Sequence, residues 1–156
     1  MLYKNVLVPF DESESARNAL QTAIEFVGDD PDARLTVLYA CSSREVDEDS
    51  FNYAAARAGI QDVTAEGYAR LQKEFMESQL AKLKKSVAAV ARGCVCHVVC
   101  HVDPAKPAQA IVSYAHERDC DVIMMGSRGL NAVRGVLGSV SYAVLSTAKM
   151  PVLIVK

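Results

Sequence analysis

The sequence predicts an α/β fold in which a doubly wound, five-stranded parallel sheet is covered by helices on both faces. The first observation is an alternation, because short apolar runs are followed by longer segments with apolar residues at helical spacing. The second is that the short runs are apolar at consecutive positions, as strands buried on both faces are. Right-handed crossovers restrict such a chain to doubly wound topologies. At 156 residues, a single domain over residues 1–156 is expected.

The first strand and the first helix open the chain. Residues 5–8 read Asn-Val-Leu-Val, and Pro9 ends this apolar run. Ser13 or Ser15 can cap the helix that follows. Apolar residues in this helix recur at helical spacing until Gly28, where we expect it to end.

The middle of the chain continues the alternation after one irregular stretch. Residues 35–40 are rich in β-forming residues and predict the second strand. Residues 42–64 begin polar and acidic, and we interpret them as an exposed excursion. For the stretch from Glu45 to Glu66 we favour an exposed insertion over a lid or a partner-binding segment. An apolar stripe with charges opposite predicts a long helix over 66–92. Alternating β-branched residues then predict the third strand over 94–102.

The last third of the chain supplies two more strands and two more helices. Pro107 suits the first position of a helix whose apolar residues face inward. The fourth strand is predicted over 121–125. A final helix begins near Ser139, and the fifth strand is predicted over 151–155.

Composition excludes several classes of protein. Hydrophobic residues make up 51% and charged residues 23%, which is ordinary for a globular domain. A net charge of −2 argues against binding to nucleic acid through phosphate contacts. No apolar run approaches the ~18–20 residues of a membrane span, and no signal peptide is recognisable. The five cysteines are an odd number and scattered, so we expect a reduced, cytoplasmic protein.

The stretch 126–139, GSRGLNAVRGVLGS, holds four of the eight glycines and directly follows the predicted fourth strand. Gly126 and Gly129 permit a close approach of backbone N–H groups to a phosphate. Gly138 and Ser139 stand where a helix N-terminus adds free N–H donors and partial positive charge. Arg128 is near in sequence. The alternative is that the glycines serve only tight packing in a strand-to-helix turn.

Asp11 is a second candidate, because it follows the first strand by three residues. We call residues 126–139 the glycine loop. If the first and fourth strands are neighbours, the Asp11 carboxylate faces the glycine loop and can accept hydrogen bonds from a ribose. The alternative for Asp11 is a carboxylate that stabilises the N-terminus of the first helix.

Together these segments resemble the universal stress protein family. The resemblance covers VLVPFDESESARNAL, LTVLYA and the stretch from DVIMMGSRGL to the end. The family pattern G-x2-G-x9-G-[ST] appears at Gly126, Gly129, Gly138 and Ser139, with eight residues in place of nine in the second gap. Ala105 stands where the family tends to carry a glycine. The resemblance implies strand order 3-2-1-4-5 in a Rossmann-like, adenine nucleotide alpha hydrolase-like fold.

The resemblance to the ATP-binding branch of the family also implies a site. It implies ATP or AMP as ligand, with Mg²⁺ held through the phosphates, and a homodimer formed through the strand at 151–155. Asp11 beside Pro9 is implied to hold the ribose, and the backbone of Ala40 to meet the adenine. The residues implied at the phosphates are Gly126, Gly129, Gly138, Ser139 and Val140, with Ser141 joining them. Arg128 is added as a nucleotide-binding candidate because it is near in sequence.

The leading hypothesis is therefore an ATP-binding regulatory module of the stress response. One alternative is an interaction protein of the same fold that binds no nucleotide, and another is a slow ATPase. Catalytic motifs are missing, because neither a phosphate-loop lysine pattern nor a G-x-S-x-G pattern is present.

A metal site is not predicted for the cysteine-rich third strand. Strand parity places Cys94, Cys96 and Cys100 on one face and His97 and His101 on the other. We interpret the cysteines as small apolar core residues.

Overall fold

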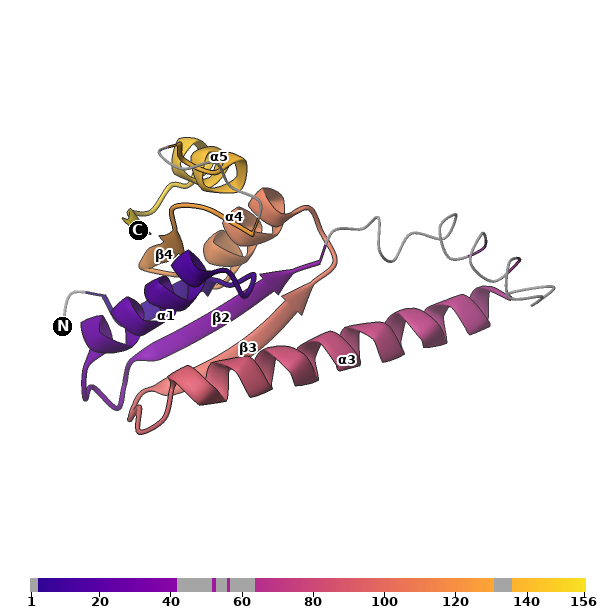
Figure 1. The fold of residues 1–156 in the computed structure, drawn as a ribbon, viewed down its shortest axis with the longest axis horizontal. Helices are drawn as coiled ribbons and strands as arrows, with labels where there is room; N and C mark the ends of the chain where they lie inside the picture. Colours follow the sequence, from indigo (N-terminus) through magenta and orange to yellow (C-terminus); the bar gives the residue numbers. More distant parts are fainter. Residues whose placement is uncertain (1–2, 42–51, 53–55, 57–63, 131–135) are drawn as a thin grey trace.

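A computed structural model describes residues 3–41, 64–130 and 136–156, together with Asn52 and Ala56. Five parallel strands form one sheet in the order β3-β2-β1-β4-β5, which confirms the expected fold class and strand order. Figure 1 labels β2, β3 and β4 of this sheet. The strands are β1 Asn5–Pro9, β2 Arg34–Ala40, β3 His97–Asp103, β4 Val122–Gly126 and β5 Val152–Val155. The helices are α1 Glu14–Val27, α3 Ala65–Val90, α4 Pro107–Glu117 and α5 Ser139–Thr147.

The central strand β1 shows why the strands are apolar at every position. Val6 and Val8 belong to the core beneath α1 and α3, whereas Leu7 belongs to the core beneath α4 and α5. All three side chains are fully buried. Because successive side chains of a strand point to opposite faces, a sheet covered on both faces needs apolar residues at every position.

The order of the strands reverses between β1 and β4. β1 pairs with β2 along its whole length, from Asn5↔Arg34 to Pro9↔Leu38. Its pairing with β4 covers only Val6↔Val122 and Leu7↔Ile123. The two strands therefore separate toward their carboxyl ends, which is where doubly wound sheets hold ligands.

Helix α1 begins and ends as its sequence predicts. Of the two candidate caps, Ser13 is the N-cap, and its hydroxyl oxygen accepts a hydrogen bond from the Ala16 N–H at 3.2 Å. Gly28 ends the helix with a φ of 54°, a backbone conformation that suits glycine. The Gly28 N–H donates to the carbonyl of Ile24 at 3.0 Å.

Helix α3 begins one residue earlier than predicted and ends two residues earlier. Thr64 is its N-cap. Leu83 and Val87 near its carboxyl end are buried against the sheet, and its first turns extend beyond the strands in Figure 1. Most of the predicted insertion at 42–64 lies outside the described residues.

The third strand begins at His97, and not at Cys94 as predicted. The chain is still turning after α3, because Gly93 has a φ of 80° and the Cys94 N–H donates to the carbonyl of Ala91. Pairing with the sheet starts when the His97 N–H donates to the carbonyl of Ala33. Although Cys94 and Cys96 precede the strand, both pack toward the core beneath α1 and α3, which is the face predicted for them.

Within β3 itself, the parity prediction is correct. Cys100 packs toward the core beneath α1 and α3, and His101 lies on the opposite face against the ring of Tyr114 in α4. Over the described residues, we find no helix that combines the length and apolarity needed to cross a membrane.

Candidate functional site

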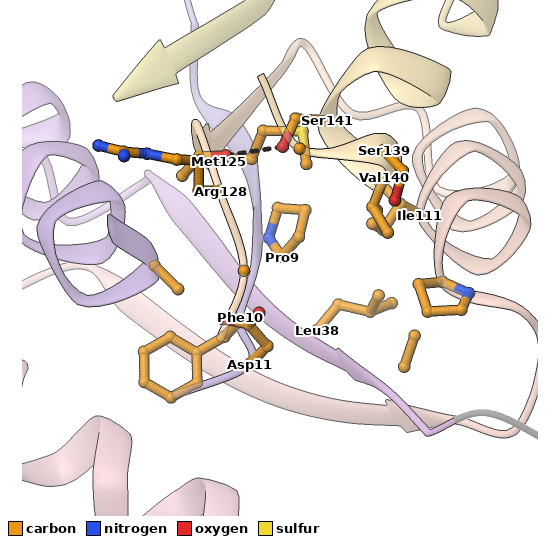
Figure 2. Close-up of a pocket in the computed structure, with 16 residues that line it drawn as sticks. Pro9, Phe10, Asp11, Leu38, Ile111, Met125, Arg128, Ser139, Val140 and Ser141 are labelled. Carbon is orange, nitrogen blue, oxygen red and sulfur yellow. Dashed lines mark hydrogen bonds between the residues drawn. The ribbon is translucent and has the colours of Figure 1, made fainter. Parts of the chain in front are cut away.

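A cavity of about 330 Å³ opens at the carboxyl ends of the strands, where β1 and β4 separate. Residues from β1, β2, β4, α1, α4 and α5 and from the loops after β1 and β4 line it (Figure 2). The structure brings together all ten residues that the sequence analysis singled out, namely Pro9, Asp11, Ala40, Gly126, Arg128, Gly129, Gly138, Ser139, Val140 and Ser141.

Asp11 and Gly129 face each other across one side of the cavity. The Asp11 carboxylate accepts a hydrogen bond from the Ser13 N–H at 3.1 Å, which fixes it at the start of α1. A Cβ atom on Gly129 would lie 2.8 Å from the other carboxylate oxygen of Asp11. Gly129 must therefore be a glycine if Asp11 is to stay in this position.

Gly126 is required for packing against α1. A Cβ atom there would lie 2.5 Å from the Ser15 hydroxyl oxygen and 2.7 Å and 2.9 Å from backbone atoms of Ser15 and Ala16. At this position the backbone of the helix leaves no space for a side chain, so tight packing alone already requires a glycine.

The first turn of α1 holds the glycine loop by its backbone. The Ser15 hydroxyl donates to the carbonyl of Arg128, and the Ser13 hydroxyl lies 3.4 Å from the same oxygen. Because the carbonyl and the N–H of a trans peptide point in opposite directions, the N–H of Gly129 points away from α1.

Helix α5 begins at the cavity. Its N-cap is Gly138, and no side chain among the described residues caps it. The Gly138 N–H donates to the carbonyl of Ser127 at 2.8 Å. The Ser141 hydroxyl is buried and donates to the carbonyl of Gly126 at 2.9 Å, the bond dashed in Figure 2. These two bonds hold the loop ends together. The amides of Ser139, Val140 and Ser141 are the donors that the first turn of α5 offers to an anion.

The other walls of the cavity are apolar. Leu38 of β2, Ile111 of α4 and Met125 of β4 are buried and line it (Figure 2). Phe10, Ala16 and Pro107 line it as well. An apolar slot beside a polar rim is the usual composition of a small-molecule site.

The sequence analysis missed these apolar residues as site residues. From the sequence, Ile111 was predicted only to lie on the inward face of a helix. Leu38 and Met125 were predicted only to lie in apolar strands. A usable signal was present for Leu38, since it lies two residues before Ala40 on the same face of β2.

The charged side chains at the cavity are Asp11 and Arg128. Figure 2 shows that the Arg128 side chain extends away from Leu38 and Ile111, so its guanidinium does not enter the apolar part. Within the part of the chain that the structure describes, no group of three or more His, Cys, Asp or Glu side chains is arranged to hold a metal ion.

Comparison with known proteins gives a consistent assignment. The family model described as "Universal stress protein family" matches residues 2–156. Universal stress protein MJ0531 of Methanocaldococcus jannaschii is 31% identical over 160 residues, which cover 99% of this chain and 83% of that protein. The solved structure of the hypothetical protein MJ0577 from the same organism has a TM-score of 0.74 at 24% identity, covering 100% of this chain and 97% of that one. At this identity the likeness shows the fold.

Two further solved structures with the same fold contain nucleotides. A universal stress protein in complex with cAMP has a TM-score of 0.61 at 22% identity, and the match covers 99% of this chain and 98% of that one. A universal stress protein from Archaeoglobus fulgidus in complex with dAMP has a TM-score of 0.54 at 21% identity, and the match covers both chains completely.

Proposed function

Since the chain belongs to the universal stress protein family, we propose that it is a regulatory module of the stress response that binds an adenine nucleotide, ATP or AMP, in the cavity between β1 and β4. The observation that carries the proposal is the meeting of three features at one cavity: the Asp11 carboxylate, the backbone of the glycine loop and the N-terminus of α5. The relatives solved with cAMP and dAMP support an adenine nucleotide as the ligand.

Each part of the cavity suits one part of a nucleotide. The apolar walls formed by Leu38 and Ile111 suit the flat base, with the backbone of Ala40 at the strand end available for its edge. The carboxylate of Asp11 suits the ribose hydroxyls. The N–H groups of Gly129, Ser139 and Val140 suit phosphate oxygens, because helix N-termini and glycine turns attract anions.

A divalent cation fits this site only through the ligand. Asp11 is the carboxylate that lines the cavity, and one carboxylate does not form a cation site by itself. Mg²⁺ would therefore be held by phosphate oxygens and water. It would neutralise phosphate charge, because no lysine side chain among the described residues lines the cavity.

A homodimer through β5 completes the proposal. β5 is an edge strand of the sheet, so its outer backbone groups can pair with another strand. Three large apolar side chains are exposed on and beside it, with exposed fractions of 65% for Tyr142, 49% for Leu145 and 42% for Leu153. A two-fold related copy would cover this surface.

Ligand binding to purified protein tests the nucleotide proposal. We expect ATP·Mg²⁺ or AMP to raise the melting temperature, since ligand at about 100 times its Kd stabilises the folded state by about 2.7 kcal/mol. Isothermal titration then gives the Kd. No binding at millimolar nucleotide would favour the interaction protein without a ligand, and ADP release from bound ATP would favour the slow ATPase.

A double-mutant cycle on Asp11 and Gly129 tests the site itself. Gly129→Ala forces the Asp11 carboxylate to move, so we expect Gly129→Ala and Asp11→Ala each to weaken binding by about tenfold, or about 1.4 kcal/mol. The double variant should be little worse than either single variant, because both remove the same contact. Asp32→Ala is the matched control, being an exposed carboxylate that pairs with Lys4. Additive losses would argue that Gly129 and Asp11 act separately.

A further inference from the structure

The connection between α3 and β3 holds two cysteines separated by one residue. Cys96 is 6% exposed and belongs to the core beneath α1 and α3, and Cys94 packs against the same core. Val95 between them is 55% exposed. The two thiols therefore point inward on the same side of the chain, and Val95 points outward.

The two sulfur atoms are in contact, with 2.7 Å between Cys94 Sγ and Cys96 Sγ. In an extended strand, residues two apart are separated by about 6.6–6.8 Å at Cα, the upper limit of the range found for disulfides. This segment lies before β3, which begins only at His97. The chain turns at Arg92 and Gly93 and bends again at Cys96, so the segment that holds both cysteines is not part of a regular strand.

We propose that Cys94 and Cys96 are a thiol–disulfide redox site, which closes to an intrachain disulfide by exchange with a small-molecule disulfide such as oxidised glutathione. This site is separate from the nucleotide proposal, because it lies at the amino ends of the strands and the cavity lies at their carboxyl ends.

The exchange proceeds in two balanced steps. The Cys94 thiolate attacks one sulfur of oxidised glutathione, which forms a mixed disulfide and releases one glutathione thiolate. The Cys96 sulfur then attacks the Cys94 sulfur, which forms the Cys94–Cys96 bond and releases the second glutathione. The two thiol protons end on the two released glutathione molecules, so the protein loses two hydrogens and oxidised glutathione gains them.

The order of attack follows from burial. Burial raises the pKa of the Cys96 thiol to about 12, with the neighbouring Cys94 adding to the shift. Cys96 is therefore a poor first nucleophile at neutral pH. Cys94 is the less buried of the two and meets the external disulfide, while contact with Cys94 gives Cys96 the proximity that the second step needs.

Cys100 provides an internal control. It lies four residues after Cys96 and within the extended strand β3, where four residues span about 13 Å. That distance is about twice the reach of a disulfide between Cα atoms, so pairing of Cys96 with Cys100 would require β3 to leave the sheet. Burial also raises the pKa of the Cys100 thiol.

The experiment maps the thiols after mild oxidation of the full chain. The reduced protein is incubated with oxidised glutathione under native conditions, quenched with acid, unfolded and alkylated with N-ethylmaleimide. Trypsin releases residues 93–118 as one peptide, because Pro107 protects the bond after Lys106. We expect this peptide to lose two of its three labels and two hydrogens, with the remaining label on Cys100, and dithiothreitol to restore all three labels.

Variants separate the proposed pair from the other possibilities. Cys100→Ser should leave ring closure unchanged, whereas Cys94→Ser and Cys96→Ser should each abolish it. Three labels on the wild-type peptide would overturn the proposal. So would a ring that includes Cys100, or a glutathione that stays on Cys94 without exchange.

Discussion

At the scale of single residues, the geometry of the cavity depends on atoms that face away from it. The carbonyl of Arg128 is held by the hydroxyls of Ser13 and Ser15 on the side of α1. This fixes the peptide plane and so the direction in which the N–H of Gly129 points. Ser15 is therefore a positioning residue for the proposed phosphate contacts, with a hydroxyl that acts through Arg128.

Replacing Ser15 with alanine tests this role. We expect Ser15→Ala to lower the free energy of unfolding by about 0.5–1.5 kcal/mol through the lost hydrogen bond. Nucleotide affinity should fall by up to about tenfold, measured by isothermal titration. Ser146→Ala is the matched control, because its hydroxyl bonds only to the carbonyl of Tyr142 within α5. Full affinity in Ser15→Ala would show that the hydroxyl does not orient the loop.

The sequence predicted the polar residues of the cavity better than the apolar ones. Asp11 and the glycines follow strand ends, and parallel strands bring those ends to one edge, so their meeting could be inferred from the order of elements. Leu38, Ile111 and Met125 could not be separated from the core. A strand pattern tells which face a side chain is on, but not whether a helix covers that part of the face or leaves a cavity.

At the scale of elements, the packing of α1 on β4 fixes where the glycine loop begins. The backbone of the first turn of α1 lies directly against Gly126, and Ser13 caps that turn. Contacts between a helix backbone and a strand end are possible only where the strand has no side chain. The N-terminus of α1 therefore serves both the fold and the cavity.

The cost of a methyl group at this contact can be measured. We expect Gly126→Ala to destabilise the protein by about 1–3 kcal/mol, because backbone atoms of α1 cannot move aside as a side chain could. Gly138→Ala should cost less, since the nearest atom to its Cβ lies 3.3 Å away. Urea unfolding of both variants gives the comparison. An equal cost at the two positions would contradict the close contact at Gly126.

The burial of His101 between β3 and α4 leads us to expect that stability depends on pH. His101 lies with its ring centroid 4.8 Å from that of Tyr114, and burial lowers the pKa of His101 below 6.5, with Asp103 raising it and Arg118 lowering it. The unfolded chain therefore binds a proton at a higher pH than the folded one. The contribution of His101 to stability is complete above about pH 6.5 and is lost as the pH falls toward the lower pKa of the folded state.

Unfolding by urea at several pH values checks this expectation. His101→Phe keeps an aromatic ring beside Tyr114. The free energy of unfolding of this variant should fall less steeply below pH 6.5 than that of the wild type, because the contribution of His101 is gone. The exposed His116 is the control, and His116→Ala should leave the pH dependence as in the wild type. A wild-type slope in His101→Phe would assign the effect to other groups.

Most helices and strands could be predicted because the capping residues and the apolar periodicity indicated the same boundaries. Ser13, Gly28 and the glycine before Ser139 are chemical signals for helix ends, and each stands at an observed end. The start of β3 was mispredicted because Cys94 to Cys96 has strand-like composition. Gly93, with a φ of 80°, keeps the chain turning there, and a φ value cannot be inferred from composition.

At the scale of the whole molecule, the parallel sheet separates two kinds of chemistry. The cavity lies at the carboxyl ends of the strands, and the contact between Cys94 and Cys96 lies just before the amino end of β3. The two edges of the sheet, β3 and β5, also differ, because β5 lies beside exposed apolar residues of α5. We propose that a second copy pairs with the β5 edge.

Light scattering tests the dimer. We expect the wild type to have about twice the mass of one chain, 16.9 kDa, at micromolar concentration. Leu153→Glu should shift the mass to that of one chain by placing a charge at the paired edge. Val95→Glu is the control, since Val95 is also exposed but lies far from β5 in the sheet order. A wild type with the mass of one chain would refute the dimer.

The close contact between Gly126 and α1 restricts how this protein can be redesigned. A side chain at position 126 would meet the backbone of α1, and one at position 129 would meet Asp11, so the backbone at these two glycines has little freedom to change. Under the proposed function, altered selectivity would therefore come from the buried walls formed by Leu38, Ile111 and Met125. A library of variants at these three wall positions would leave Gly126 and Gly129 unchanged. It would vary the shape of the apolar part of the cavity, where we propose that the base binds.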